Sequence, residues 1–397
     1  MPDSTDPKPG IHPDIIKLGL VSFLTDLSSE IIFSVFAIFF TTIAGASAAL
    51  LGLIEGLADL SASSLNYLAG WLSDRTGKRK GFVMLGYGFS TAAKIILLVS
   101  SSITGLSIFR VIERLGKSFR GPPRDAWLAT VAHQSTRGYA FGIHKAIDKA
   151  GAVLGPLLAY AILSWLGEGL ETFKILFLVA LVPAVLSIVL LSMVEDKPGI
   201  PHPRESMLDS WKALTPSFKR YLITSGIFSL AYFSFSFLLL RAPTVGFSIK
   251  DIVLLYALFN IACVIAAPLI GRLSDRIGRA HMIMLGYLLY LLMSLGFAFA
   301  TMKWQVVVLF LVFGVFYAID EAQSKAFIAD LEHHRRASAI GMYNTVTGML
   351  YLPASLVAGA LWLINPASAF LLAAAFASVA LLAFLCLRPD REIRQPR

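Results

Sequence analysis

Charged residues are scarce in this chain of 397 residues. Lys, Arg, Asp and Glu together make up 15% of it, whereas 56% of the residues are hydrophobic and the mean hydropathy is +0.72. Soluble globular domains carry about 25% charged residues, so this composition excludes that class and indicates a protein embedded in a lipid bilayer. The net charge of +9 does not indicate a nucleic-acid partner, because the basic residues stand in short loops between apolar runs.

Cysteine is nearly absent as well. The two cysteines, Cys263 and Cys386, both lie within apolar runs, so the sequence offers neither a disulfide framework nor a cysteine-based metal site. No His-rich metal set or nucleophile constellation is present, which argues against a membrane-embedded enzyme. We therefore expect no cofactor and no metal.

Long apolar runs dominate what the chain does contain. Runs of about 20 residues predict twelve membrane-spanning helices, and the polar, proline-bearing segment 195–217 predicts a cytosolic linker between two halves of six helices each. The predicted helices occupy residues 15–44, 47–73, 81–100, 102–130, 138–166, 173–193, 218–242, 248–272, 280–300, 302–328, 337–363 and 367–388. The predicted domains are an N-terminal tail (1–14), an N-terminal bundle (15–194), the linker (195–217), a C-terminal bundle (218–388) and a C-terminal tail (389–397).

A short basic turn occurs twice, at residues 70–80 (GWLSDRTGKRK) and 271–281 (GRLSDRIGRAH). A recurrence after half the chain indicates internal duplication. Both copies resemble motif A, the loop signature in each half of major facilitator superfamily transporters, here of the bacterial twelve-helix type. The residues that we expect to form a cytosolic gate are Gly70, Asp74, Arg75, Gly77, Arg79, Gly271, Asp275, Arg276 and Gly278.

The resemblance covers essentially the whole chain. It implies an all-α membrane protein of twelve transmembrane helices in two pseudo-symmetric six-helix bundles, with a solute site between them near the midplane. It also implies that one chain suffices for function. Because basic residues gather in the loops on one side, we expect a multi-pass protein of the bacterial inner (cytoplasmic) membrane with both termini in the cytosol.

Ionisable residues within the predicted helices are concentrated in the N-terminal half. Such residues are costly in a bilayer and mark candidate functional sites. An offset of 201 residues places Tyr256 opposite Glu55 and Asn260 opposite Asp59, so the fold itself does not require these acids. Because a buried carboxylate can carry a proton and a nearby arginine can reset it, we predict coupling to protons, with Na⁺ as the alternative ion. The candidate coupling residues are Asp26, Glu30, Glu55, Asp59, Arg110 and Glu113.

Two helices carry partial family signatures. Residues 106–116 resemble motif B, whose arginine, here Arg110, is associated with proton coupling, although two neighbouring positions depart from the motif. Gly151, Gly155 and Pro156 resemble the start of motif C, the antiporter signature, but its later glycines are missing. The alternative for this second set is a small-residue packing face with a proline kink.

The solute is predicted from the remaining polar and aromatic candidates. Basic side chains favour an anionic, polycarboxylate or siderophore-like solute. If nearby acids neutralise these bases, a proton-antiport exporter of cationic or neutral drug-like compounds becomes equally consistent. The candidate substrate-binding residues are Lys94, Arg114, Lys117, Lys145, Asp148, Tyr232, Tyr256 and Arg241.

Three further alternatives concern these assignments. Lys94 can instead form a structural ion pair with Glu55 or Asp59. Of the adjacent residues Asp320 and Glu321, we expect at most one to face a common cavity, because neighbouring helical positions point in different directions. A receptor that keeps the transporter fold without turnover is the alternative from a different functional class.

Overall fold

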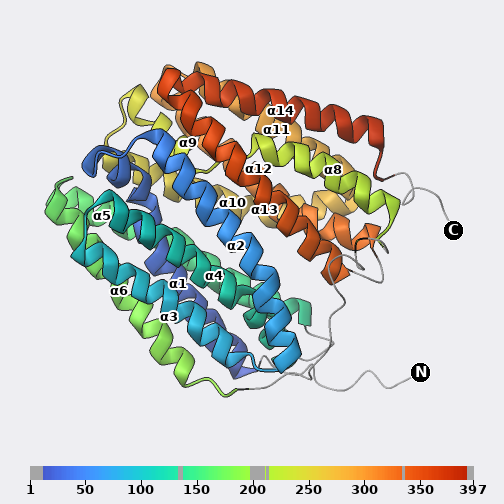
Figure 1. Ribbon diagram of the computed structural model, residues 1–397, viewed down its shortest axis with the longest axis horizontal. Helices are drawn as coiled ribbons and strands as arrows, with labels where there is room; N and C mark the ends of the chain where they lie inside the picture. Colours follow the sequence, from blue (N-terminus) through green and yellow to red (C-terminus); the bar gives the residue numbers. More distant parts are fainter. Residues whose placement is uncertain (1–11, 133–136, 197–210, 212–213, 333–335, 391–397) are drawn as a thin grey trace.

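The computed structural model describes residues 12–132, 137–196, 211, 214–332 and 336–390. They form an all-α protein of two helical bundles, as predicted (Figure 1). The N-terminal half contains α1 (Pro13–Ile38), its π-helical continuation η1 (Phe39–Ile43), α2 (Ala48–Thr76), α3 (Lys80–Val99), α4 (Ile103–Val131), α5 (Arg137–Leu166) and α6 (Leu170–Ser192). The C-terminal half contains α8 (Pro216–Ala231), α9 (Ser236–Arg241), η3 (Pro243–Val245), α10 (Ile249–Ile277), α11 (Arg279–Phe299), α12 (Lys303–Leu331), α13 (Arg336–Ile364) and α14 (Pro366–Leu387).

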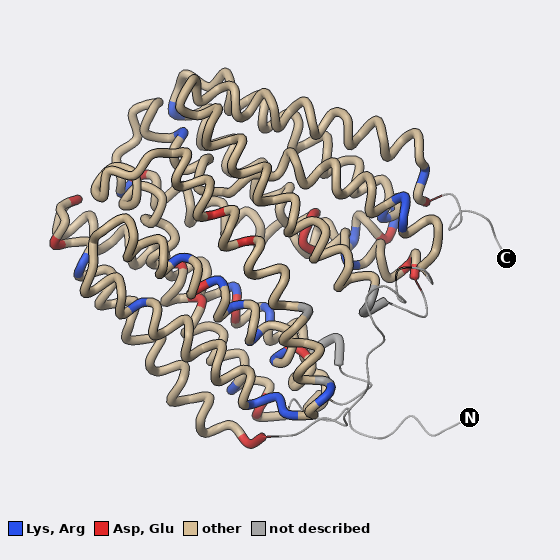
Figure 2. The backbone as a smooth tube through the Cα atoms, in the orientation of Figure 1, with Lys and Arg blue, Asp and Glu red and all other residues tan. Residues whose placement is uncertain are grey.

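Within the described ranges, eleven segments are long and apolar enough to cross a membrane, with α8 and α9 counted as one. The remaining long helix, α4, carries too many charges to qualify by composition, although its 29 residues are long enough. Its polar residues recur on one face, which the helix turns toward the other half. Figure 2 shows charged positions gathered along the inner side of the N-terminal half.

One predicted helix, 218–242, is broken into α8 and α9. Serine hydroxyls replace the helical hydrogen bonds at the break: Ser355 on α13 accepts from the Ser234 N–H at 3.1 Å, and Ser234 accepts from the Ser236 N–H at 3.2 Å. Such local bonds compete with a helix. The break brings residues 232–236 to the space between the two halves.

The internal duplication predicted from the sequence is visible in matched contacts. Arg79 donates to the Ala126 carbonyl at 2.6 Å, and Arg279 donates to the Ala326 carbonyl at 2.9 Å, each across 47 residues. The turn glycines Gly77 and Gly278 both have positive φ, +68° and +89°, where α2 and α10 end. Each half therefore repeats the same helix–turn–helix connection.

The two halves pack most extensively through α2 and α13. We call the face where α1 begins and α14 ends the terminal face, and the opposite one the far face (Figure 1). Toward the far face, α2 packs directly on α13, since a Cβ atom on Gly52 would lie 2.3 Å from the Ser355 carbonyl oxygen. At the same face, the Glu168 carboxylate accepts from the Lys250 and Ile249 N–H groups at the start of α10, at 3.0 and 3.3 Å. These contacts close the far face.

Candidate functional site

A cavity of about 510 Å³ lies between the two halves. It is lined by residues of α1, α2, α4 and α5 on one side and of the α8–α9 junction, α9, α10, α12 and α13 on the other. Cavities of roughly 300–1,000 Å³ are typical of small-molecule sites. The Lys145 side chain lines the cavity near the terminal face and is nevertheless 52% exposed. The cavity is therefore accessible to solvent at Lys145.

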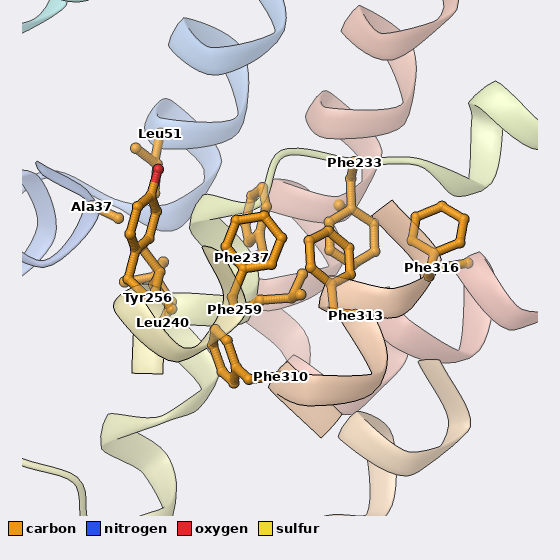
Figure 3. Close-up of a cluster of buried hydrophobic side chains, with 14 of the residues drawn as sticks. Ala37, Leu51, Phe233, Phe237, Leu240, Tyr256, Phe259, Phe310, Phe313 and Phe316 are labelled. Atoms are coloured by element: carbon orange, nitrogen blue, oxygen red, sulfur yellow. The ribbon is translucent and has the colours of Figure 1, made fainter. Parts of the chain in front are cut away.

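The two walls of the cavity differ in chemistry. The N-terminal wall contributes seven bases and five acids, whereas the lining residues described in the C-terminal half include two acids and no base. Charged residues of the N-terminal wall are Arg110, Arg114, Lys117, Arg120, Arg124, Lys145, Lys149, Asp26, Glu30, Glu55, Asp59 and Asp148. The C-terminal wall presents Asp320, Glu321, Tyr232, Phe233, Phe235, Tyr256, Phe259, Phe313, Tyr317 and Tyr351. Figure 3 shows Tyr256, Phe259 and Phe313 in one cluster of rings.

Arg110 and Glu55 form the central ion pair. The Arg110 guanidinium donates two bonds to the Glu55 carboxylate, from Nε at 2.8 Å and from Nη2 at 2.7 Å, and lies 4.4 Å from the Phe33 ring centroid. Glu55 is only 1% exposed, and it also accepts from the Ser236 hydroxyl of the opposite half at 3.2 Å. A bidentate bond fixes both side chains in one geometry. The carboxylate thus contacts both halves at once.

Glu30 makes a second hydrogen bond between the two halves. Its carboxylate on α1 accepts from the Tyr256 hydroxyl on α10 at 2.5 Å. Asp59, one turn after Glu55 on α2, instead pairs within the N-terminal half with Arg114, at 3.0 Å. Of these three acids, Glu30 and Glu55 therefore bond across the halves, whereas Asp59 bonds to Arg114 within its own half.

Glu113 and Lys94 lie behind the cavity rather than along it. Both are fully buried. Lys94 donates to the Ser29 hydroxyl at 3.2 Å, Ser29 donates to Glu113 at 3.5 Å, and Glu113 is 3.8 Å from Arg110. The alternative of an ion pair between Lys94 and Glu55 or Asp59 is wrong, because Arg110 and Arg114 occupy those carboxylates.

Lys145 connects the two halves nearer the terminal face. Its ammonium lies 2.9 Å from Glu321 on α12 and 3.6 Å from Asp148, and Lys149 lies 3.7 Å from Glu321. Asp320 lines the cavity as well, so the expectation that at most one of the two adjacent acids faces it is wrong. Neighbouring positions diverge by about 100° around a helix, and the cavity is broad enough to contact both.

Five charged residues of the cavity have no oppositely charged partner within 4 Å in the described part of the chain: Asp26, Glu30, Lys117, Arg120 and Asp320. Two of them are held by hydrogen bonds, since Glu30 accepts from the Tyr256 hydroxyl and Arg120 donates to the Ser90 hydroxyl at 2.6 Å. Asp26 and Lys117 lack a hydrogen bond in that part of the chain, and Asp320 has only a long contact of 3.5 Å from the Ser324 hydroxyl. Lys117 contributes to the electrostatic environment of Asp26 across the N-terminal wall. Asp26, Lys117 and Asp320 are available to a bound solute or ion.

Arg241 lies away from the cavity, at the end of α9. Its guanidinium donates to the Phe297 and Ala300 carbonyls, both at 2.9 Å, and to the Thr244 hydroxyl at 2.6 Å. It thereby satisfies the free carbonyls at the end of α11, as basic side chains commonly do. Arg241 does not line the cavity, so its assignment to the substrate site has no support from this geometry.

The motif A turns lie at the terminal face, outside the cavity. Gly70 is buried and Gly271 is half-buried, and Arg75 stacks on Trp71 at 5.1 Å from the ring centroid. Asp275 and Arg276 are exposed, and the side chain of Asp74 lies outside the described residues. The gate assigned to these turns stays a prediction.

Gly151 and Gly155 allow α5 to pack on α1. A Cβ atom at Gly151 would lie 2.4 Å from the Phe23 carbonyl oxygen, and one at Gly155 would lie 2.9 Å from the Leu27 carbonyl oxygen. Pro156 lies within the continuous helix α5. The contacts are those of a small-residue packing face inside the N-terminal half. The antiporter interpretation of this segment stays a prediction.

Some lining residues were not among the predicted site residues. Lys149 follows Lys145 by four positions, so the helical spacing could have indicated it. Ser236 could not be found in this way, because the helix break that exposes it depends on a contact with α13. Asp320 and Tyr351 carry no local signal beyond being polar or aromatic within apolar helices.

Comparisons with known proteins agree with this architecture. The sequence profile of the Major Facilitator Superfamily matches residues 18–319 and 222–397. An uncharacterised MFS-type transporter of Methanocaldococcus jannaschii is 36% identical over 368 residues, 91% of each chain. Multidrug resistance protein MdtH of Cronobacter sakazakii is 30% identical over 149 residues, 36% of this chain and 35% of that protein. A bacterial homologue of the human lysosomal transporter Spinster, solved in an inward-facing, unoccupied conformation, matches with a TM-score of 0.76 at 16% identity, over 98% of this chain and 100% of that one.

Proposed function

Because this chain belongs to the major facilitator superfamily and is a membrane transporter of that type, we propose that it moves a small organic solute by alternating access, with protons as the coupling ion. The solute site is the cavity between the halves. In this proposal, the two bundles rock about that cavity so that it opens to one side of the membrane at a time.

The orientation follows from the distribution of basic residues. The turns at 70–80 and 271–281 lie at the terminal face, and basic loops remain on the cytosolic side of a membrane. The terminal face is then cytosolic, the membrane is the bacterial inner membrane, and the described conformation is open toward the cytosol. One chain contains both halves of the cavity, which supports function as a monomer.

The observation that supports proton coupling is the pair of bonds that two carboxylates make across the halves. Glu30 accepts from Tyr256 and Glu55 accepts from Ser236. Both bonds require the halves to be close on the far side of the cavity. A proton that binds either carboxylate changes these bonds and the Arg110 pair together, so proton binding is linked to the conformational equilibrium.

Proton flux in proteoliposomes tests this proposal. Purified protein is reconstituted with a pH-sensitive dye inside, and organic acids, amines and compounds carrying both groups are added outside. A coupled solute changes the internal pH: acidification indicates symport, and alkalinisation indicates antiport. Glu55→Gln and Glu30→Gln should abolish the solute-dependent change, whereas Glu171→Gln, which removes an exposed acid paired with Lys174, should not. Solute uptake without any proton movement would refute proton coupling.

Proton-antiport export of cationic or neutral compounds is a second candidate function. Two observations favour it: the aromatic C-terminal wall holds Asp320, which has no base within 4 Å among the described residues, and a relative matching about a third of this chain is named a multidrug resistance protein. Ring faces attract organic cations. Efflux of a fluorescent lipophilic cation from cells, lost in Asp320→Asn, would support this function over solute uptake.

A further inference from the structure

We infer that the solute is bipolar, with an acidic group and an ammonium group at opposite ends of an apolar body. The acidic end is bound by Lys117 on α4, and the ammonium end is bound by Asp320 on α12. This inference rests on the proposed transport function and adds the chemical class and the orientation of the solute.

The first step is the pairing of the other charges. Arg110 and Arg114 are neutralised by Glu55 and Asp59, and Glu321 is shared by Lys145 and Lys149. Ion pairs of this kind are satisfied inside the protein, so they offer little to a solute. The ammonium of Lys117 has no such partner in the described part of the chain, and it is exposed to the cavity.

The second step concerns the opposite wall. Asp320 has no basic partner within 4 Å among the described residues, although Lys325 interacts with its carboxylate electrostatically, and aromatic side chains line the cavity around it. Tyr232 and Tyr351 have ring centroids 5.3 Å apart and lie within electrostatic range of its carboxylate. Tyr317, three positions earlier on α12, lines the same cavity. A carboxylate beside ring faces suits an organic ammonium, which gains both a charge partner and cation–π contacts.

The third step is the choice between solute classes. A purely anionic solute would leave Asp320 unpaired in a cavity from which water has been displaced, and a purely cationic one would leave Lys117 unpaired. Uncompensated buried charges are costly. A bipolar solute neutralises both. Because its two ends are held by different halves, it would also draw the halves together at the terminal face, as closure requires.

Asp26 weakens the binding of the solute's acidic end to Lys117 but does not prevent it. Its carboxylate lies on the same wall as Lys117 and attracts the same ammonium electrostatically. The acidic end of the solute and Asp26 therefore compete for Lys117. The cavity volume of about 510 Å³, equal to roughly 17 water molecules at about 30 Å³ each, accommodates a small two-ended molecule between the walls.

The test compares three matched probes: 4-(aminomethyl)benzoic acid, its N-acetyl derivative, which is only anionic, and its methyl ester, which is only cationic. Longer homologues of each probe form a parallel set. Binding is measured calorimetrically with the purified full chain, and proton flux is measured in proteoliposomes. We expect the bipolar compounds to bind at least tenfold more tightly than both derivatives and to drive the flux.

Two variants assign the ends. In Lys117→Gln, the bipolar probe should bind no better than its ester, and in Asp320→Asn it should bind no better than its N-acetyl derivative. Glu171→Gln removes an exposed acid outside the cavity and should leave the preference intact. Measuring all three probes on each variant separates loss of one contact from misfolding, because the untouched end still discriminates.

The outcomes separate this inference from the proposed function. If anionic or cationic probes alone bind best and drive proton flux, transport stands and the bipolar inference is overturned. If the bipolar preference persists in both variants, the assignment to Lys117 and Asp320 is overturned. If no probe of any class binds or drives flux, the result counts against both the inference and proton-coupled transport of small organic solutes.

Discussion

The two halves of the protein share one fold but differ in what they present to the cavity. Matched contacts recur in both, such as the bonds of Arg79 to Ala126 and of Arg279 to Ala326. The cavity positions do not match: the N-terminal wall is charged, and the C-terminal wall is aromatic. Residues that build the bundle are therefore repeated, whereas residues that face the solute have diverged.

The difference is clearest where equivalent positions of α2 and α10 line the same cavity. Glu55 and Asp59 stand on α2, and Tyr256 and Asn260 stand on α10. The acids pair with arginines of their own half, and the tyrosine donates to Glu30 of the other half. The N-terminal half thus supplies ionic groups to the cavity. The C-terminal half supplies aromatic rings and hydroxyl groups, and two of these hydroxyls donate to carboxylates of the N-terminal half.

The largest expected effect comes from breaking the central pair of the charged half. In Glu55→Gln, Arg110 loses its carboxylate in a buried site, which costs about 3–5 kcal/mol for pairs of this kind. We expect a large fall in the thermal unfolding temperature in detergent, together with loss of proton-coupled flux. The double variant Glu55→Gln/Arg110→Gln should regain only part of the stability, because Arg110 is no longer left unpaired but the buried Glu113 loses its ion-pair partner at 3.8 Å, and it should not regain transport. A single variant as stable as the parent protein would refute the structural role of the pair.

The next largest effect is expected from disturbing the packing of α2 on α13, which joins the two halves at the far face. In Gly52→Ala, the new Cβ would meet the Ser355 carbonyl oxygen of α13, so α2 and α13 cannot close at the far face. We expect the equilibrium to shift toward opening at that face. A cysteine replacing Ser236, in a background without Cys263 and Cys386, should then react several-fold faster with a membrane-impermeant thiol reagent added from the far side.

Gly88→Ala provides the matched control for this experiment. A Cβ at Gly88 meets no atom within 4 Å, so the substitution changes helix propensity alone. The labelling rate at the engineered cysteine should remain that of the parent. Equal rates in the Gly52 and Gly88 variants would show that the packing of α2 on α13 does not limit access to the cavity.

The sequence was sufficient to predict the fold and most of the charged residues of the cavity, but not the ion pairs and hydrogen bonds among them. Apolar run length predicts the spans because a bilayer fixes helix length. Helical spacing predicts which residues share a face, as for Glu55 and Asp59, which both line the cavity. It does not give distances between helices, and so Lys94 was considered as a partner for Glu55, which pairs with Arg110 instead. The break at residues 232–235 depends on Ser355, a residue far away in sequence.

A smaller and more specific effect is expected from Asp26, which is unpaired in the described part of the chain. In Asp26→Asn, a candidate proton carrier is lost without breaking an ion pair. We expect coupled uptake to be abolished while solute exchange remains measurable in counterflow assays. Stability should stay close to that of the parent, in contrast to Glu55→Gln. Unchanged coupled transport would remove Asp26 from the coupling residues.

The smallest expected effect lies at the far face, where one acid of the charged half caps a helix of the other. Glu168 accepts from the first N–H groups of α10 at 3.0 and 3.3 Å, in addition to interacting with the positive end of the helix. Exposed interactions of this kind contribute about 0.3–1 kcal/mol, so Glu168→Gln should raise far-side labelling of the Ser236→Cys reporter by about two- to fivefold. Glu171→Gln, a similar acid near the start of α6, lacks this contact and should have no effect.

Because screening by salt weakens exposed charge interactions, high salt should reduce the difference between Glu168→Gln and the parent. A difference that is insensitive to salt would mean that the hydrogen bonds of Glu168, rather than its charge, hold the halves together at this face.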